Sequence, residues 1–105
     1  MYFHAGLSTK NNPSWWLYGD NREQVGWAGR IFDSVNDAKA AAEYFRANVT
    51  AAVFDVYLDE RNEWRWRAFV GGDRVASSGE AFASGSNARR AAENVQVNAG
   101  SATAP

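Results

Sequence analysis

Cysteine is absent from this sequence, and histidine occurs once, as His4. The first absence excludes disulfide bonds, thiolate metal sites and cysteine nucleophiles together. The second excludes a pair of histidine metal ligands and leaves no second imidazole to act beside the first. Neither a dinucleotide-binding glycine motif nor a Walker phosphate loop is present, so we expect no metal and no cofactor. Because no catalytic constellation is visible, the sequence predicts a protein that is not an enzyme.

Net charge and long apolar runs are also lacking. The formal net charge is -1, whereas a protein that binds nucleic acid mainly through phosphates is usually basic. No apolar run approaches a membrane span, and no basic-then-apolar leader pattern is seen. We therefore expect a cytoplasmic protein with no membrane partner. With 46% hydrophobic residues and five tryptophans, the chain has the composition of a folded domain.

The clearest positive signal is self-similarity at a period of fifty residues. Ten pairs are identical when positions 16–48 are laid on 66–98, among them Trp16/Trp66, Val25/Val75, Gly29/Gly79, Ser34/Ser84 and Ala38/Ala88. The match continues upstream if one residue of loop length is allowed there. We therefore predict two repeats, 1–50 and 51–105. A unit of this size buries too little surface to be stable alone, so the two should share one core.

The second repeat shows a well-defined hairpin pattern. Residues 54–58 and 64–68 alternate apolar and polar side chains, as half-buried strands do. Residues 60–62 suit a three-residue loop, and Gly71–Gly72 suits a tight turn before a third strand at 75–77. This register predicts an apolar face with the pairs Phe54/Ala68, Val56/Trp66 and Leu58/Trp64. It places Asp55/Arg67 and Tyr57/Arg65 on the opposite face.

An amphipathic helix follows the strands in each repeat. Ser34 and Ser84 are suitable N-caps. Alanines recur at helical spacing behind both serines and form a narrow apolar stripe that can lie close to large side chains on a sheet. The predicted fold is α+β: tandem β-β-β-α repeats form one antiparallel sheet with two helices on one face and a pseudo-two-fold axis.

The run of residues 62–68, with the Gly-Gly turn, the strand 75–78, Phe82, Ser84 and the alanine-rich helix, resembles the YegP-like family of bacterial and archaeal domains of unknown function. The resemblance implies a short final strand in each unit, which the two units exchange. Residues Thr50–Val53 would be that strand in the first repeat. The small-residue tail 100–105 is expected to be disordered instead of forming the second one. The family brings no known activity to this chain.

The sheet face opposite the helices is the candidate binding surface. The repeat alignment puts Trp64 and Trp66 toward the core and leaves aromatic, apolar and arginine side chains on this open face, together with His4. The candidate contact residues are Trp15, Leu17, Tyr57, Arg65, Arg67 and Phe69. An exposed patch of this kind typically marks contact with a protein or a small ligand. We therefore predict a non-enzymatic binding or interaction module whose ligand the sequence does not identify.

Three alternatives stay open at this stage. Aromatics and arginines on a sheet also occur in proteins that bind single-stranded nucleic acid, although Asp55 opposite Arg67 would partly neutralise that surface. An enzyme would need a cleft between the repeats with at least two convergent polar groups. A self-associating structural protein would use the open face or a free strand edge. We expect a monomer that is itself a pseudo-dimer.

Overall fold

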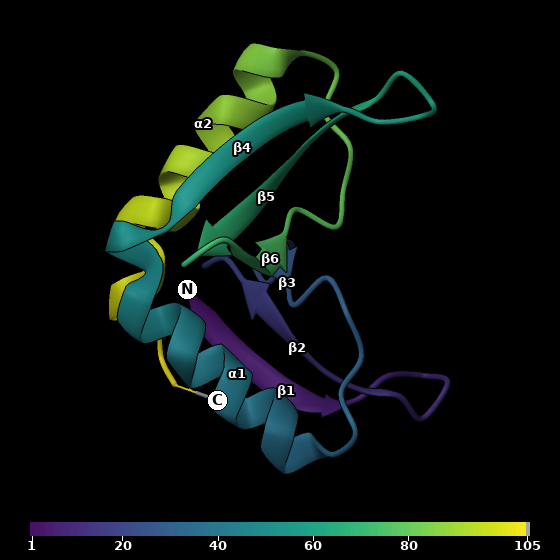
Figure 1. Cartoon of the computed structure of the whole chain (residues 1–105), viewed down its shortest axis with the longest axis vertical. Coiled ribbons are helices and arrows are strands. Elements are labelled where there is room, and N and C mark those ends of the chain that lie inside the picture. The colour runs from purple at the N-terminus through teal and green to yellow at the C-terminus, as the bar shows by residue number, and fades with distance from the viewer. Residues whose placement is uncertain (105) are drawn as a thin grey trace.

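The structure is a computed structural model that describes residues 1–104. The same order of elements, three strands, an α-helix and a 3-10 turn, occurs twice along the chain (Figure 1). In the first half these are β1 (Tyr2–Leu7), β2 (Pro13–Tyr18), β3 (Gln24–Trp27), α1 (Val35–Asn48) and η1 (Val49–Ala51). In the second half they are β4 (Val53–Leu58), β5 (Trp64–Val70), β6 (Asp73–Ser77), α2 (Gly85–Asn98) and η2 (Ala99–Ser101).

The strands form one antiparallel six-stranded sheet in the order β1-β2-β3-β6-β5-β4. The two halves meet at its centre, where Trp27 of β3 lies opposite Ser77 of β6. Both helices lie on the same side of the sheet, α1 against β1 and β2 and α2 against β4 and β5 (Figure 1). The predicted α+β class is therefore confirmed, with one sheet face covered and the other open. Within residues 1–104 no helix is long and apolar enough to cross a membrane.

Both helices begin directly after the predicted N-cap serines, Ser34 and Ser84. The Ser34 hydroxyl accepts the backbone N–H of Asp37 at 3.0 Å, and Ser84 accepts that of Asn87 at 3.1 Å. Each bond satisfies an N–H group that has no partner inside the helix. The alanine-rich faces of both helices pack into the same core as Trp15 and Trp66 of the sheet. Their buried members are Ala38, Ala42 and Phe45 in α1 and Ala88, Ala92 and Val95 in α2.

The β4–β5 hairpin has the predicted register at every pair, from Phe54 opposite Ala68 to Leu58 opposite Trp64. Its loop closes through Asn62, which has a left-handed φ of 61°. An asparagine tolerates this conformation because its short polar side chain bonds locally. The next turn is made by Gly71 and Gly72, with φ of 60° and 86°. Positive φ at both positions is what a two-residue primed turn requires.

The predicted orientation of the first half is wrong at β2. Trp15 and Leu17 were expected on the open face, but both are fully buried in the core. The carbonyl of Trp15 accepts the N–H of Ala28, as the carbonyl of Trp66 accepts that of Ser78. Both indoles are buried, and neither N–H has an acceptor in the described part of the chain. The counterpart of Trp66 is therefore Trp15, not Trp16.

The physical reason is the position of one extra residue. The sequence comparison placed the extra residue of the first half before β2. The hydrogen bonds place it in the loop between β2 and β3. The two halves are offset by 51 residues at Trp15 and Trp66, before this loop, and by 50 at the capping serines, after it. Side chains in a strand alternate between faces, so a slip of one residue exchanges the two faces completely. Because Trp15 and Trp16 are adjacent, the wrong register still aligned a tryptophan, Trp16, with Trp66.

The expectation for the end of each half also needs correction. Residues Thr50–Val53 do not form a separate exchanged strand: Val49–Ala51 is a 3-10 turn, and Val53 already begins β4. The tail is not disordered over residues 99–103, since Thr103 bridges β1 in parallel. Its N–H donates to the Met1 carbonyl at 3.1 Å, and its carbonyl accepts the Phe3 N–H at 3.0 Å. Pro105 lies outside the described residues.

Candidate functional site

Flat side chains stacked across neighbouring strands cover the open face in the first half. The rings of Tyr2 and Tyr18 stack at 5.2 Å between centroids. The imidazole of His4 stacks on the indole of Trp16 at 6.0 Å. These pairs join β1 to β2 directly opposite one another in the register. They form a ribbon of ring surface on the side of the sheet that the helices leave uncovered.

The open face of the second half is built around Arg67. Its guanidinium lies 4.2 Å from the ring centroid of Tyr57 and 5.7 Å from that of Phe69. Its Nε also donates to Asp55 at 3.0 Å. The cation is thus held over two rings and paired with a carboxylate. In the register of the two halves, the Asp55–Arg67 pair is the counterpart of the His4–Trp16 pair.

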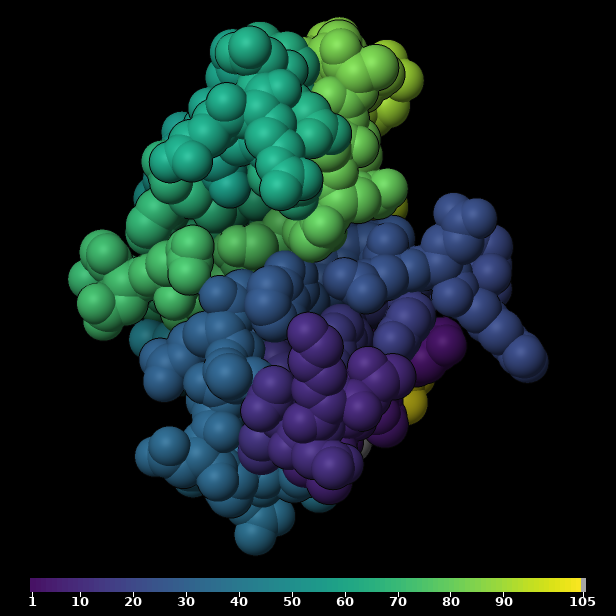
Figure 2. Space-filling model, turned by 90° about the vertical axis from the view of Figure 1, so that its right-hand side faces the viewer, coloured from purple at the N-terminus to yellow at the C-terminus, as the bar shows by residue number. Residues whose placement is uncertain are grey.

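A groove of about 430 Å³ lies on this face where the two halves meet. Figure 2 views the molecule from this side, with the first half in purple to blue and the second in teal to green. We call this hollow the arginine groove, and the side chains that line it include Trp27 from the first half and Tyr57, Arg61, Arg65, Arg74 and Ser77 from the second. Because Trp27 and Ser77 are opposite each other across the central strand pair, the groove exists only when both halves are in place.

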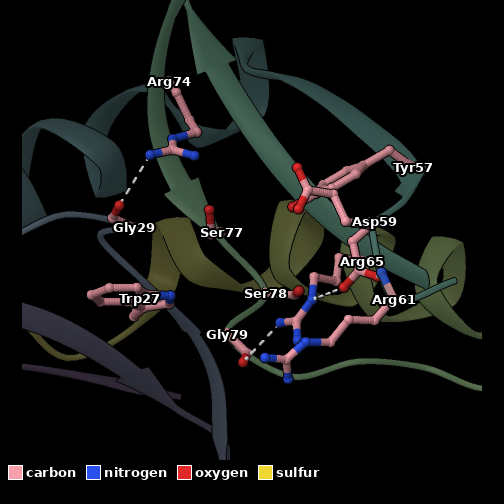
Figure 3. Close-up of a pocket in the computed structure, with 11 residues that line it drawn as sticks. Trp27, Gly29, Tyr57, Asp59, Arg61, Arg65, Arg74, Ser77, Ser78 and Gly79 are labelled. Atoms are coloured by element: carbon pink, nitrogen blue, oxygen red, sulfur yellow. Dashed lines mark hydrogen bonds and ion pairs between the residues drawn. The ribbon is translucent and has the colours of Figure 1, made fainter. Parts of the chain in front are cut away.

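Arg65 is fixed at one side of the groove by two hydrogen bonds (Figure 3). Its Nε donates to Asp59 Oδ2 at 2.7 Å, and one terminal nitrogen donates to the Gly79 carbonyl at 3.1 Å. The other oxygen of Asp59 accepts the backbone N–H groups of Arg61 and Glu63. Hydrogen bonding to Arg65 and to these backbone groups lowers the pKa of Asp59, and the same carboxylate raises the pKa of Arg65. The pair is therefore ionised throughout the neutral range.

Arg74 is anchored at the other side of the groove. One of its terminal nitrogens donates to the Gly29 carbonyl at 3.1 Å (Figure 3). Gly29 and Gly79 have positive φ, 76° and 74°, so their carbonyls face directions that other residues rarely allow. A Cβ at Gly29 would also lie 2.9 Å from Ser77 Oγ, and one at Gly79 would lie 2.7 Å from Gln24 Nε2. Two equivalent glycines thus orient two arginines toward the same groove.

The groove is polar but uneven in charge. Three arginines line it, against the carboxylates Asp59 and Glu60. Asp59 is already engaged by three hydrogen bonds on its own hairpin, so it faces its loop and Arg65. Two guanidiniums, those of Arg61 and Arg74, are left without a carboxylate partner among the described residues. The arrangement favours a bound anion over a bound cation.

The predicted contact residues are divided by the structure. Tyr57 and Arg65 line the groove, and Arg67 with Phe69 lies beside it on the same face. Trp15 and Leu17 are in the core. The residues that were missed are Trp16, Trp27, Arg61 and Arg74. Placing the extra residue of the first half in its second hairpin loop would have turned Trp16 outward, but only the pairing of β3 with β6 shows that Trp27 and Arg74 meet.

The single histidine lies away from the groove. His4 lines a separate hollow of about 350 Å³ with Trp16 and Tyr18. No group of three or more histidine, aspartate or glutamate side chains in residues 1–104 is placed to hold a metal ion. The imidazole and the carboxylates of the arginine groove therefore line different hollows of the open face.

Two solved structures have this fold. One is the UPF0339 protein of Shewanella oneidensis, with a TM-score of 0.78 and 12% identity over 97% of this chain and 86% of that one. The other is the yegP protein of E. coli, described as a protein of unknown function, with a TM-score of 0.79 and 16% identity over 97% and 88%. No protein-family model and no curated protein matches the sequence. The α+β fold implied by the YegP-like resemblance, one antiparallel sheet with two helices, is thus confirmed.

Proposed function

We propose that this protein is a non-enzymatic binding module that holds its ligand on the open sheet face, in the arginine groove. The observation that carries this proposal is the position of the groove at the seam of the two halves, where an aromatic ring and three guanidiniums surround one space. Groups of such different chemistry, drawn from distant parts of the chain, are typical of ligand sites.

The state of the titratable groups supports binding over catalysis. A general base works best when its pKa is near the working pH. The pKa of Asp59 is lowered by Arg65 and by backbone N–H groups, so this carboxylate is a weak base. His4 lines a different hollow and cannot share a substrate with it. What the groove offers is positive charge, hydrogen-bond donors and a ring face.

The anchoring of the arginines supports the same proposal. Arg65 donates a hydrogen bond to the Gly79 carbonyl, and Arg74 donates one to the Gly29 carbonyl. These bonds reduce the conformational freedom of both side chains before a ligand binds. Side chains that are already oriented lose less entropy when a ligand binds. A purely solvated arginine would show no such fixed partners.

The test uses the full chain and native mass spectrometry. The protein is incubated with a total metabolite extract of the source cell, desalted and weighed, beside the variants Trp27→Ala and Arg74→Ala. Lys39→Ala is the control, because Lys39 is exposed on α1 and is not among the residues that line the groove. We expect a discrete adduct on the wild type and the control and its loss from both groove variants. Absence of any adduct, or an adduct that all four proteins keep, would overturn the proposal.

The same spectra report the number of chains per particle. We propose that the protein binds as a monomer, since each half supplies what a second copy would otherwise contribute to the groove. A dimer mass that persists on dilution would contradict this part of the proposal and would favour self-association through the open face or a strand edge.

A further inference from the structure

We infer that the arginine groove takes a nucleoside monophosphate, with the phosphate on the arginines and the base on Trp27; this rests on the proposed function. The same chemistry is offered by a free mononucleotide and by the phosphorylated end of a single strand. Four observations lead to this ligand: the unused arginine donors, the indole on the facing wall, a serine hydroxyl and the size of the groove.

The arginines of the groove have N–H donors that make no hydrogen bond within the described residues. A guanidinium carries five N–H groups in a planar fork. Arg65 uses one on Asp59 and one on Gly79, and Arg74 uses one on Gly29. The guanidinium of Arg61 has no hydrogen bond within the described residues and lies beside that of Arg65 (Figure 3). The neighbouring forks of Arg61 and Arg65 match phosphate oxygens, and the charge of a monophosphate would offset Arg61 and Arg74, which no carboxylate of residues 1–104 pairs.

The second observation is the indole. Trp27 lies across the groove from Arg61 and Arg65, with Ser77 and Ser78 between them (Figure 3). It is half-buried, and its Cδ1 lies 3.0 Å from where a Cβ of Gly79 would be, so the ring is held against a bare backbone. An aromatic side chain fixed in this way is a stacking platform for a nucleobase.

The hydroxyl of Ser77 is the third. It lines the groove, and Figure 3 draws no hydrogen bond between it and the other lining residues. A hydroxyl can both donate and accept, so it suits a sugar oxygen between base and phosphate. A ligand with only an anionic group, such as inorganic phosphate, would leave this position and Trp27 unused.

Size and charge limit the ligand to one nucleotide. A space of about 430 Å³ is at the small end of the range for ligand sites. A long strand needs a basic track for its phosphates, whereas the whole chain has a net charge of -1. Arg67, the next cation along the face, is already paired with Asp55. The groove therefore fits a single nucleotide.

The experiment follows the five indole N–H signals of the full chain by NMR, the signal of Trp27 being assigned with Trp27→Phe. Each of the four ribonucleoside 5′-monophosphates is added up to about 1 mM, an ordinary cellular ligand level. Nucleosides and inorganic phosphate are added separately. We expect the Trp27 signal to move with at least one monophosphate, and at least tenfold weaker binding of the matching nucleoside. Equal binding of nucleoside and nucleotide, or no shift with any monophosphate, would overturn the inference.

Variants test the two halves of the ligand. Trp27→Ala should weaken binding about tenfold, in the range that loss of one stacking partner causes. Arg61→Ala and Arg74→Ala should weaken it and reduce its salt dependence, while Lys39→Ala on the outer face of α1 should leave it unchanged. Unchanged binding in all three groove variants, with their thermal unfolding preserved, would place the ligand elsewhere and overturn the inference.

A further comparison separates the two sources. A single-stranded hexanucleotide is titrated with and without a 5′-phosphate. Binding that depends on the terminal phosphate supports the strand end as a source, and binding of mononucleotides alone supports the free nucleotide. Binding of the strand with no response to mononucleotides would overturn the inference. A metabolite adduct of another mass, lost from Trp27→Ala, would overturn this inference while the proposed binding function stands.

Discussion

Arg46 and Gln96 each hydrogen-bond the segment that follows the helix of the other half. Arg46 of α1 donates its Nε to the Ala102 carbonyl at 2.7 Å, and Gln96 of α2 donates its Nε2 to the Ala52 carbonyl at 2.9 Å. They are fifty residues apart, as are the two alanines. Both carbonyls directly follow a 3-10 turn and have no helical partner of their own. The linker between the halves and the C-terminal tail are thus held by the same device.

Arg46→Met should lower the free energy of unfolding by about 1.5–3 kcal/mol, the usual cost of losing a hydrogen bond to a charged group. The methylene stem is kept, so the loss reports the Ala102 carbonyl and the docking of the tail on β1. Urea unfolding followed by circular dichroism measures it. Lys39→Met is the control, because Lys39 is exposed on the same helix, and a loss as large in the control would show that charge alone is responsible.

Leu17→Ala should destabilise the protein by about 2–5 kcal/mol, because it leaves a cavity in the core. Its neighbour in β2, Trp16→Ala, should cost less than about 2 kcal/mol despite the larger side chain, since Trp16 lies on the open face and loses mainly its stack on His4. Denaturant unfolding of the two variants compares them directly. A larger loss for Trp16→Ala would mean that the register of β2 is the one the repeat alignment predicted.

Gly79→Ala and Gly72→Ala differ in their effect on the groove. Both replace a glycine of positive φ, so both should cost about 1 kcal/mol in backbone strain. A Cβ at Gly72 meets nothing within 4 Å, whereas one at Gly79 meets Gln24 Nε2 at 2.7 Å and Trp27 Cδ1 at 3.0 Å. Only Gly79→Ala should move the Trp27 indole N–H signal. An unmoved signal would show that the indole is not held by the Gly79 backbone.

The Asp59–Arg65 pair should make stability depend on acid pH. The pKa of Asp59 is lowered in the folded protein, chiefly by its hydrogen bond to Arg65. The folded state therefore gains stability above the ordinary carboxyl pKa of about 4 and loses it as pH falls toward the lowered value. Asp59→Asn should be less stable than the wild type at pH 7, and the gap should narrow below about pH 4. Thermal unfolding of both proteins from pH 7 to pH 2.5 measures this; a gap independent of pH would rule out the ion pair as its cause.

Local chemistry made much of the fold predictable. The alternation in residues 54–58 and 64–68 fixed which pairs lie opposite each other, because a three-residue loop leaves one register. The helix starts were predictable because a serine hydroxyl satisfies N–H groups that nothing else reaches. Each of these features depends on residues within about a dozen positions of one another, so the sequence alone carried the information.

The orientation of β2 was not decided by local pattern. The doublet Trp15–Trp16 fits either face equally well, and the choice depends on where one extra residue of the first half is placed. The tertiary structure places it in the loop after β2, because the large side chains of Trp15 and Leu17 then fill the space under α1. Burial of that apolar area outweighs any preference a short strand has by itself.

By itself, the sequence determined an α+β chain with two similar halves, its second hairpin and its two capped helices. The arginine groove was decided only by tertiary structure. Trp27 and Ser77 are fifty residues apart, and each half holds only part of the site. They meet because β3 and β6 satisfy each other's backbone hydrogen bonds at the centre of the sheet, an edge-to-edge pairing that no local pattern specifies. The fold could therefore be predicted one half at a time, whereas the site required both halves.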